Sequence, residues 1–194
     1  RVLGAEGGPA PSNQIAVGFI GVGDHGTGWN LRRYLELQDL CRVRVVCDVD
    51  GARMKRAKEI VDGQYLNQDC AMSRDFREVL ARKDLDAVMI STPDHWHTLI
   101  SVLALRAGKD VQCEKPTLTL DEGKVLVREV RQHQRIFQTS TEDRSIPVYH
   151  RMAELVRNGR IGKLEKIEVI LPRQPGVPGD PTPQPVPEPA PTGK

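Results

Sequence analysis

The chain has 194 residues, a formal net charge of +2 and 39% hydrophobic residues, a length that suits one domain with part of a second. The near-neutral charge without a basic run argues against a nucleic-acid partner, and no apolar stretch is long enough to predict a membrane span. The four cysteines form no Cys-x-x-Cys pair, which disfavours a disulfide or metal framework.

The chain opens with a glycine- and proline-rich arm over residues 1–13, which we expect to be flexible, and then enters a strand–turn–helix pattern. An apolar run, Ile15–Ile20, predicts a strand, and helical spacing follows over Thr27–Leu37. Between them lies the sequence Gly21-Val22-Gly23-Asp24-His25-Gly26. In such a loop the first glycine permits a tight turn, the second lets a pyrophosphate approach the backbone, and the third lets the helix pack on the strand. The N–H groups that begin the helix would then face the phosphates.

The second predicted strand ends in a carboxylate. Val43–Cys47 is apolar, and Asp48 follows about twenty residues after the last glycine of the loop. A carboxylate there accepts hydrogen bonds from the adenosine ribose and repels a 2′-phosphate, which favours NAD over NADP. Arg53 weakens this preference, because its guanidinium could reach a 2′-phosphate. The alternative is a phosphate-free turn in which Asp48 caps the next helix, Ala52–Val61.

Strands and helices alternate through the rest of the chain. Helices are expected over Asp75–Ala81 with Ser73 as N-cap, His97–Ala107, Leu120–His133 and Val148–Asn158, and strands over Ala87–Ser91, Asp110–Cys113, Ile136–Thr139 and Leu164–Leu171. This alternation predicts an α/β fold with a doubly wound parallel sheet. From Pro172 onward proline recurs so often that we expect an extended segment.

Two further motifs lie at predicted strand ends, where doubly wound sheets bind their ligands. The first runs from Ser91 to His97 and places Thr92 and Pro93 beside a dinucleotide. We expect His97 to cap the next helix or to hydrogen-bond near the cofactor, while Trp96 is either packed or in contact with a ligand. His95 and His97 lack a third metal ligand at suitable spacing, so we expect no metal.

The second motif is Cys113-Glu114-Lys115-Pro116. A lysine at this position could hold a substrate hydroxyl or assist proton transfer, and Glu114 could orient it.

In their order and spacing these motifs closely resemble the Gfo/Idh/MocA oxidoreductases, the relatives of glucose–fructose oxidoreductase and inositol dehydrogenase. The resemblance runs from about Ile15 to Leu171. It implies a Rossmann fold that binds NAD, with NADP as the alternative cofactor, and it implies that Lys115 is catalytic at the nicotinamide and substrate. The cofactor-binding residues that it implies are Gly21, Gly23, Asp24, His25, Gly26, Asp48, Thr92, Pro93, His97, Glu114 and Lys115.

The resemblance also implies a domain organisation. We expect a nucleotide-binding domain over residues 14–160 and the start of a substrate and oligomerisation domain over 161–194, with a proline-rich loop. In the family this second domain is a mostly antiparallel α+β sheet that supplies an acid/base histidine. We expect this chain to hold only its first strand, as a fragment of a longer enzyme or a truncated protein.

The resemblance implies an NAD(P)-dependent oxidoreductase that acts on a sugar, polyol or related carbinol, and a homo-oligomer at full length. Two alternatives stay open: an NAD-dependent glycoside hydrolase of the same fold, and a truncated dinucleotide-binding module without catalysis. The segment Arg1-Val-Leu-Gly-Ala-Glu-Gly7 resembles the stretch after a twin-arginine export signal. We therefore expect a periplasmic or otherwise exported protein, with a cytoplasmic one as the alternative.

Overall fold

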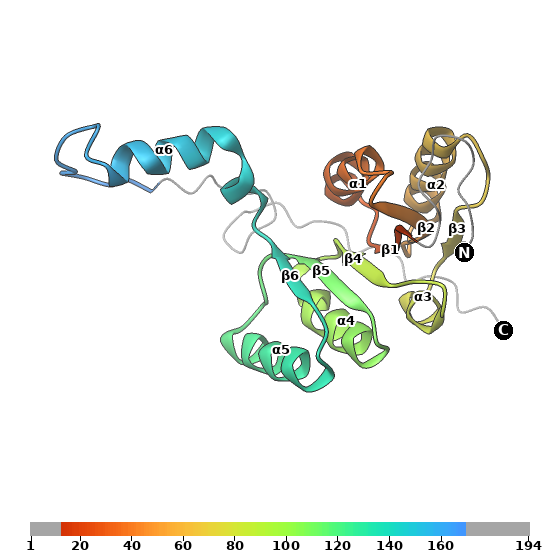
Figure 1. The fold of residues 1–194 in the computed structure, drawn as a ribbon. Coiled ribbons are helices and arrows are strands. Elements are labelled where there is room, and N and C mark those ends of the chain that lie inside the picture. Colours follow the sequence, from red (N-terminus) through yellow and green to blue (C-terminus); the bar gives the residue numbers. More distant parts are fainter. Residues whose placement is uncertain (1–12, 170–194) are drawn as a thin grey trace, which may run out of the picture. The chain divides into compact units, whose positions relative to one another are not determined.

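The computed structural model describes residues 13–169, and its central feature is a six-stranded sheet (Figure 1). Its strands are β1 (Ile15–Ile20), β2 (Cys41–Cys47), β3 (Ala71–Ser73), β4 (Ala87–Ile90), β5 (Asp110–Glu114) and β6 (Phe137–Ser140). They pair in parallel in the order β3-β2-β1-β4-β5-β6. This confirms the predicted doubly wound Rossmann sheet. The order reverses direction between β1 and β4, so a crevice opens at the carboxyl ends of these two strands.

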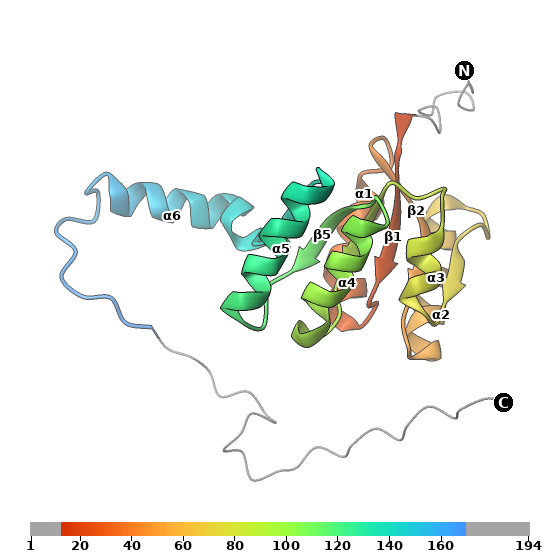
Figure 2. The same cartoon turned by 90° about the horizontal axis from the view of Figure 1, so that it is seen from below.

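Helices cover both faces of the sheet (Figure 2). One face carries the π-helical turn η2 (Gly26–Leu31), α1 (Arg32–Glu36) and α2 (Gly51–Tyr65), and the other carries α3 (Phe76–Ala81), α4 (Asp94–Arg106) and α5 (Leu120–His133). Successive strand residues point to opposite faces, so β1 sends Phe19 toward α1 and α2 and Ile20 toward α4. Burial on both faces explains why the central strands β1 and β4 read as continuous apolar runs.

A buried ammonium group stabilises the end of the sheet opposite the crevice, where the parallel strands begin. Lys109, in the turn between α4 and β5, is only 6% exposed. Its Nζ donates to the carbonyl oxygens of Arg82 at 2.6 Å and Leu85 at 2.7 Å, which belong to the turn between α3 and β4. These bonds satisfy the buried charge and tie two neighbouring turns together.

Several element boundaries differ from those predicted. The strand β3 was not anticipated, α2 extends to Tyr65, and α4 begins at Asp94. Ser73 is not the cap of α3, because its hydroxyl donates to Asp75 O and Glu78 Oε2. Asp75 is the cap, and its carboxylate accepts from the backbone N–H of Arg77 at 2.8 Å.

The sheet and its helices form one compact unit, which extends to Arg144, within the short 3₁₀ helix η3 (Glu142–Ser145). A second unit begins at Ser145 and contains α6 (Pro147–Arg157). The predicted strand Leu164–Leu171 is wrong over residues 164–169, which form no strand. A strand needs a neighbour to bond its N–H and C=O groups, and no described strand pairs with this segment.

Residues 170 and 171, the proline-rich tail and the arm up to residue 12 lie outside the described residues. Within residues 13–169, no helix has the length and apolar composition that a membrane span requires.

Candidate functional site

The glycine loop has the local geometry that its sequence predicts. Gly21 has a φ of +85°, and a Cβ there would lie 2.6 Å from the carbonyl carbon of Ser91. A Cβ on Gly26 would lie 2.4 Å from Gly21 O. A Cβ on Gly23, by contrast, would meet among the described residues only Arg53 Nη1, at 3.6 Å. Gly21 and Gly26 are therefore required by packing, whereas the backbone at Gly23 is open to an approaching ligand.

Asp48 ties the glycine loop to the end of β2. Its Oδ2 accepts from the N–H of Val22 at 2.9 Å, and its Oδ1 accepts from the N–H of Asp50 at 2.9 Å. Each carboxylate oxygen keeps a second lone pair for a ligand. The alternative in which Asp48 caps the next helix is wrong, because Asp50 caps α2 by accepting from Ala52 N at 2.8 Å and Arg53 N at 3.2 Å. The hydrogen bonds from Arg53 and Ala52 lower the pKa of Asp50.

A cleft of about 610 Å³ runs over the carboxyl ends of β1, β2 and β4. Its lining includes the predicted residues Gly21, Gly23, Asp24, His25, Gly26, Asp48, Thr92 and Pro93. It also includes Arg53, which the sequence reasoning considered, and Arg74, Phe76, Arg77 and Ile100, which it did not select. The segment from Arg74 to Arg77 was missed because it follows β3, the strand that was not predicted. The Phe76 ring lies 6.2 Å from Trp96 in an edge-to-face arrangement, so Trp96 is both packed and part of the lining.

The end of the cleft beside β2 combines one carboxylate with guanidinium groups. Asp48 lines it together with Arg53 and Arg74, and Arg74 Nη2 donates to Val49 O at 3.1 Å. Cys47 contributes a neutral thiol, because burial, aided by the charge of Asp48, raises its pKa to about 12. This end of the cleft therefore offers both a carboxylate that can accept a hydrogen bond from a ribose hydroxyl and guanidinium groups that can bind a phosphate.

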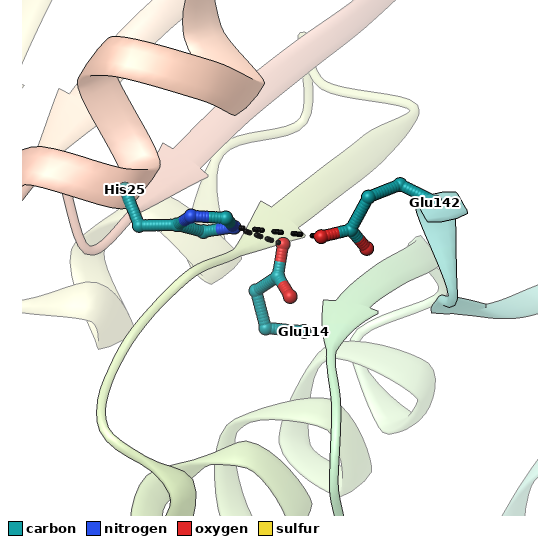
Figure 3. Close-up of side chains that lie close together, drawn as sticks. All are labelled: His25, Glu114 and Glu142. Atoms are coloured by element: carbon teal, nitrogen blue, oxygen red, sulfur yellow. Dashed lines mark hydrogen bonds and ion pairs between the residues drawn. The ribbon is translucent and has the colours of Figure 1, made fainter. Parts of the chain in front are cut away.

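A hydrogen-bonded network joins the glycine loop to the ends of β5 and β6 (Figure 3). His25 Nε2 lies 3.1 Å from Glu114 Oε1 and 4.0 Å from Glu142 Oε1. Asn30 Nδ2 donates to the same Glu114 oxygen at 2.7 Å and to Ser91 Oγ at 3.0 Å. Neither Asn30 nor Glu142 was predicted, because the partners of both lie far away in the sequence.

The same cluster brings together three residues of types that bind metals, one histidine and two glutamates. The ligand-type atoms of His25, Glu114 and Glu142 all lie within 4.8 Å of one another. The Asn30 amide occupies the Glu114 oxygen that faces His25, which favours a hydrogen-bonded network over a cation site.

The three remaining predicted residues lie outside the cleft lining. His97 is 2% exposed, and its Nδ1 and Nε2 lie 2.9 Å from Pro116 O and 2.7 Å from Thr92 O. With both nitrogens on backbone carbonyls, His97 can neither cap α4 nor bind a metal with His95. Glu114 is buried in the network, and Lys115 follows it, exposed, with a cis bond to Pro116.

The cleft fits a dinucleotide on three observations. Gly23 leaves the backbone open for a pyrophosphate, and Asp48 offers acceptors to a ribose. Thr92 Oγ1 is buried and has no hydrogen-bond partner among residues 13–169, although Thr92 lines the cleft. A ligand that bonds this hydroxyl would remove the cost of leaving it unpaired.

Comparison with known proteins agrees with this geometry. Residues 15–141 match the model of the GFO_IDH_MocA family, "Oxidoreductase family, NAD-binding Rossmann fold". An α-N-acetylgalactosaminidase of Shewanella oneidensis is 33% identical over 122 residues, covering 58% of this chain and 25% of that enzyme. The oxidoreductase YrbE of Bacillus subtilis is 28% identical over 157 residues, covering 78% of this chain and 42% of YrbE.

A solved structure extends the comparison to a bound cofactor. The scyllo-inositol dehydrogenase of Lactobacillus casei, with NAD(H) and scyllo-inositol, superposes with a TM-score of 0.65 at 26% identity, covering 77% of this chain and 42% of that chain. This chain thus spans less than half the length of each of these three relatives.

Proposed function

Because this chain belongs to the Gfo/Idh/MocA family of NAD-binding oxidoreductases, we propose that it is the nucleotide-binding part of an enzyme that oxidises a carbinol carbon of a sugar or polyol. The observation that carries this proposal is the cleft at the carboxyl ends of β1, β2 and β4, with the open backbone at Gly23 and the acceptors of Asp48. When bound, NAD supplies the ring that accepts hydride, and the protein supplies orientation and electrostatics.

Residues of the cleft and of the neighbouring loop after β5 have separate roles in this proposal. The N–H groups after Gly23 bind the pyrophosphate, Asp48 binds the adenosine ribose, and Thr92 donates its hydroxyl, which has no partner within residues 13–169. Lys115 holds the substrate hydroxyl and assists the transfer of its proton. Glu114, fixed by Asn30 and His25, anchors the segment from which Lys115 projects.

The proposed cofactor preference is NAD over NADP. Asp48 accepts from a free 2′-hydroxyl and repels a 2′-phosphate. Arg53 and Arg74 line the same part of the cleft and reduce the discrimination. The preference is therefore expected to be modest, and it is measured by parallel titrations of the two dinucleotides.

The proposal is tested by titrating NAD into the 194-residue chain and by following NADH formation with inositols and sugars in the full-length protein. Saturable NAD binding with substrate-dependent NADH formation is the expected result. Failure of the chain to bind either dinucleotide would reject the proposal.

A glycoside hydrolase that uses NAD without consuming it is the second candidate, and the 33% identity to an α-N-acetylgalactosaminidase favours it. The readout separates the two functions. Release of an aglycone without net NADH would favour the hydrolase, and net NADH from a free sugar or polyol would favour the dehydrogenase.

We also propose that the full-length protein is exported and assembles as a homo-oligomer. The resemblance of the first residues to a stretch after an export signal supports the first part. Finding that translation starts close to Arg1, without an upstream signal, would reject export. Light scattering of the full-length protein tests the assembly.

A further inference from the structure

The histidine of the glycine loop lies where the cleft meets the ends of β5 and β6 (Figure 3). Of the three residues drawn there, only His25 lines the cleft, and its side chain is 52% exposed. Its Nε2 lies 3.1 Å from Glu114 Oε1. Because a carboxylate oxygen accepts, Nε2 donates in this bond, and Glu114 thereby fixes the orientation of the imidazole ring.

The second ring nitrogen of His25 is available to a ligand. Within residues 13–169, Nδ1 has no hydrogen bond to another residue, and the side chain does not cap the helical turn η2 that follows it. A hydroxyl group can either donate to Nδ1 or accept from it, so a contact between the two does not depend on the charge of the ring.

A carboxylate beside His25 also lacks a donor. Glu142 Oε1 lies 4.0 Å from His25 Nε2, which is too far for a hydrogen bond, and Glu142 Oε2 is buried with no partner within residues 13–169. Buried polar atoms in native proteins are nearly always hydrogen-bonded. A ligand hydroxyl that donates to this carboxylate would remove the deficit.

The order of the strands decides which half of a dinucleotide reaches these groups. The sheet runs β2-β1-β4-β5-β6 on this side, with Asp48 after β2, the glycine loop after β1, Glu114 at the end of β5 and Glu142 just after β6. With Asp48 on the adenosine ribose and the backbone at Gly23 on the pyrophosphate, the nicotinamide half extends toward β5 and β6. Lys115, which directly follows Glu114, places the substrate on the same side.

We propose that His25 and Glu142 form a hydroxyl-binding pair at the reacting end of the cleft. His25 Nδ1 bonds one hydroxyl group, and the Glu142 carboxylate accepts from another. These hydroxyl groups belong either to the ribose that carries the nicotinamide or to the sugar or polyol substrate, two sources with the same chemistry. The inference rests on the proposed function and adds to it a ligand-binding side chain that the glycine loop itself supplies.

The first arm of the test compares two nucleotides in the 194-residue chain. ADP carries the adenosine and the pyrophosphate, and ADP-ribose adds the second ribose. In His25→Gln the side-chain amide can still donate to Glu114, but no group replaces Nδ1. If the second ribose is the ligand, calorimetric titration should show that His25→Gln weakens ADP-ribose by about 3- to 10-fold, the worth of one hydrogen bond, and leaves ADP unchanged.

The second arm measures KM in the full-length protein, for the inositol, sugar or glycoside that it turns over at saturating NAD. If the substrate is the source of the hydroxyl groups, both nucleotides bind His25→Gln as they bind the wild type, and KM rises by about 3- to 10-fold. Glu142→Met keeps the length of the side chain without its acceptors and should act in the same direction. It keeps the test decisive if His25→Gln does not fold.

The matched control is His133→Gln, because His133 Nε2 also lies beside a glutamate, 3.5 Å from Glu129 Oε2, but on α5 and outside the cleft lining. It should change neither arm. Wild-type behaviour of both cleft variants in both arms would overturn the inference, as would an equal loss of ADP and ADP-ribose, which indicates a packing role. If the wild-type chain binds neither nucleotide, the proposed function is rejected and this inference falls with it. If it binds both and the cleft variants match it in both arms, only this inference falls.

Discussion

Three glycines in one short segment, Gly23, Gly26 and Gly28, provide a matched series, because an alanine methyl meets different surroundings at each. At Gly26 the added Cβ lies 2.4 Å from Gly21 O and 3.1 Å from Ser91 Cβ. A backbone oxygen cannot rotate away, so the strand–helix packing must open. Overpacking of this kind costs about 1–3 kcal/mol or more. At Gly28 no described atom lies within 4 Å of the added Cβ, and replacing a helical glycine by alanine stabilises by up to about 1 kcal/mol.

The free energies of unfolding of Gly26→Ala and Gly28→Ala should therefore differ by about 1–4 kcal/mol. Gly23→Ala should unfold like the wild type, since among the described residues its Cβ meets only the exposed Arg53 guanidinium, at a van der Waals distance of 3.6 Å. The new methyl would, however, keep a pyrophosphate from the backbone. Loss of one hydrogen bond to a charged group, about 1.5–3 kcal/mol, weakens NAD binding by roughly 10- to 150-fold.

Urea unfolding followed by circular dichroism measures stability, and calorimetric titration measures NAD affinity. The series separates a packing role from a ligand role within six residues of chain. Equal stabilities of Gly26→Ala and Gly28→Ala would refute the packing argument. Wild-type NAD affinity in a folded Gly23→Ala chain would refute the placement of the pyrophosphate.

Four further predictions concern the cleft and its surroundings. Asp48→Ala should weaken NAD more than NADP in paired titrations, whereas Asp50→Ala, which removes the cap of α2, should lower helix stability. Because backbone N–H groups lower the pKa of Asp50, its cap is at full strength above about pH 4 and is lost as the pH falls through the lowered value, so an acid unfolding series should move to higher pH in Asp50→Asn. Lys115→Ala in the full-length enzyme should lower kcat/KM by at least about a hundredfold with little change in NAD affinity, and the 194-residue chain alone should bind NAD without oxidising sugars. Since burial raises the pKa of Cys47 to about 12, a thiol reagent at about pH 8 should react slowly with this residue in the native chain and quickly after unfolding; equal rates would contradict its burial.

The strand–glycine–helix unit and the carboxylate after β2 could be predicted from sequence because their chemistry is local. Gly21 needs a positive φ, and Gly26 needs contact with a backbone five residues earlier. Because such requirements allow only glycine at these positions, they can be recognised in a single sequence.

Elements that depend on distant partners could not be predicted in this way. The strand β3 reads Ala-Met-Ser, which has no strand signature, and it forms because Val45 and its neighbours pair with it. Residues 164–169 have a strand-like pattern, yet no described strand pairs with them. Likewise Asn30 meets Glu114 across 84 positions of sequence, a distance over which no local pattern carries information.

The cleft lies where the parallel strands end, and the turns that lead into the strands lie at the opposite end of the sheet. This separation has a practical consequence for engineering. The turn between α1 and β2, with the exposed residues Asp39 and Leu40, lies at the end of the sheet opposite the cleft. The strand β2 runs from this turn directly to Asp48. A circularly permuted fluorescent protein inserted after Asp39 would leave every lining residue intact and still be coupled to the Asp48 carboxylate of the cleft by a single strand. The turns that Lys109 holds together are unsuitable for such an insertion, because opening them would leave a buried ammonium without its carbonyls. The turn between α1 and β2 is therefore a suitable insertion site for building an optical sensor for a dinucleotide.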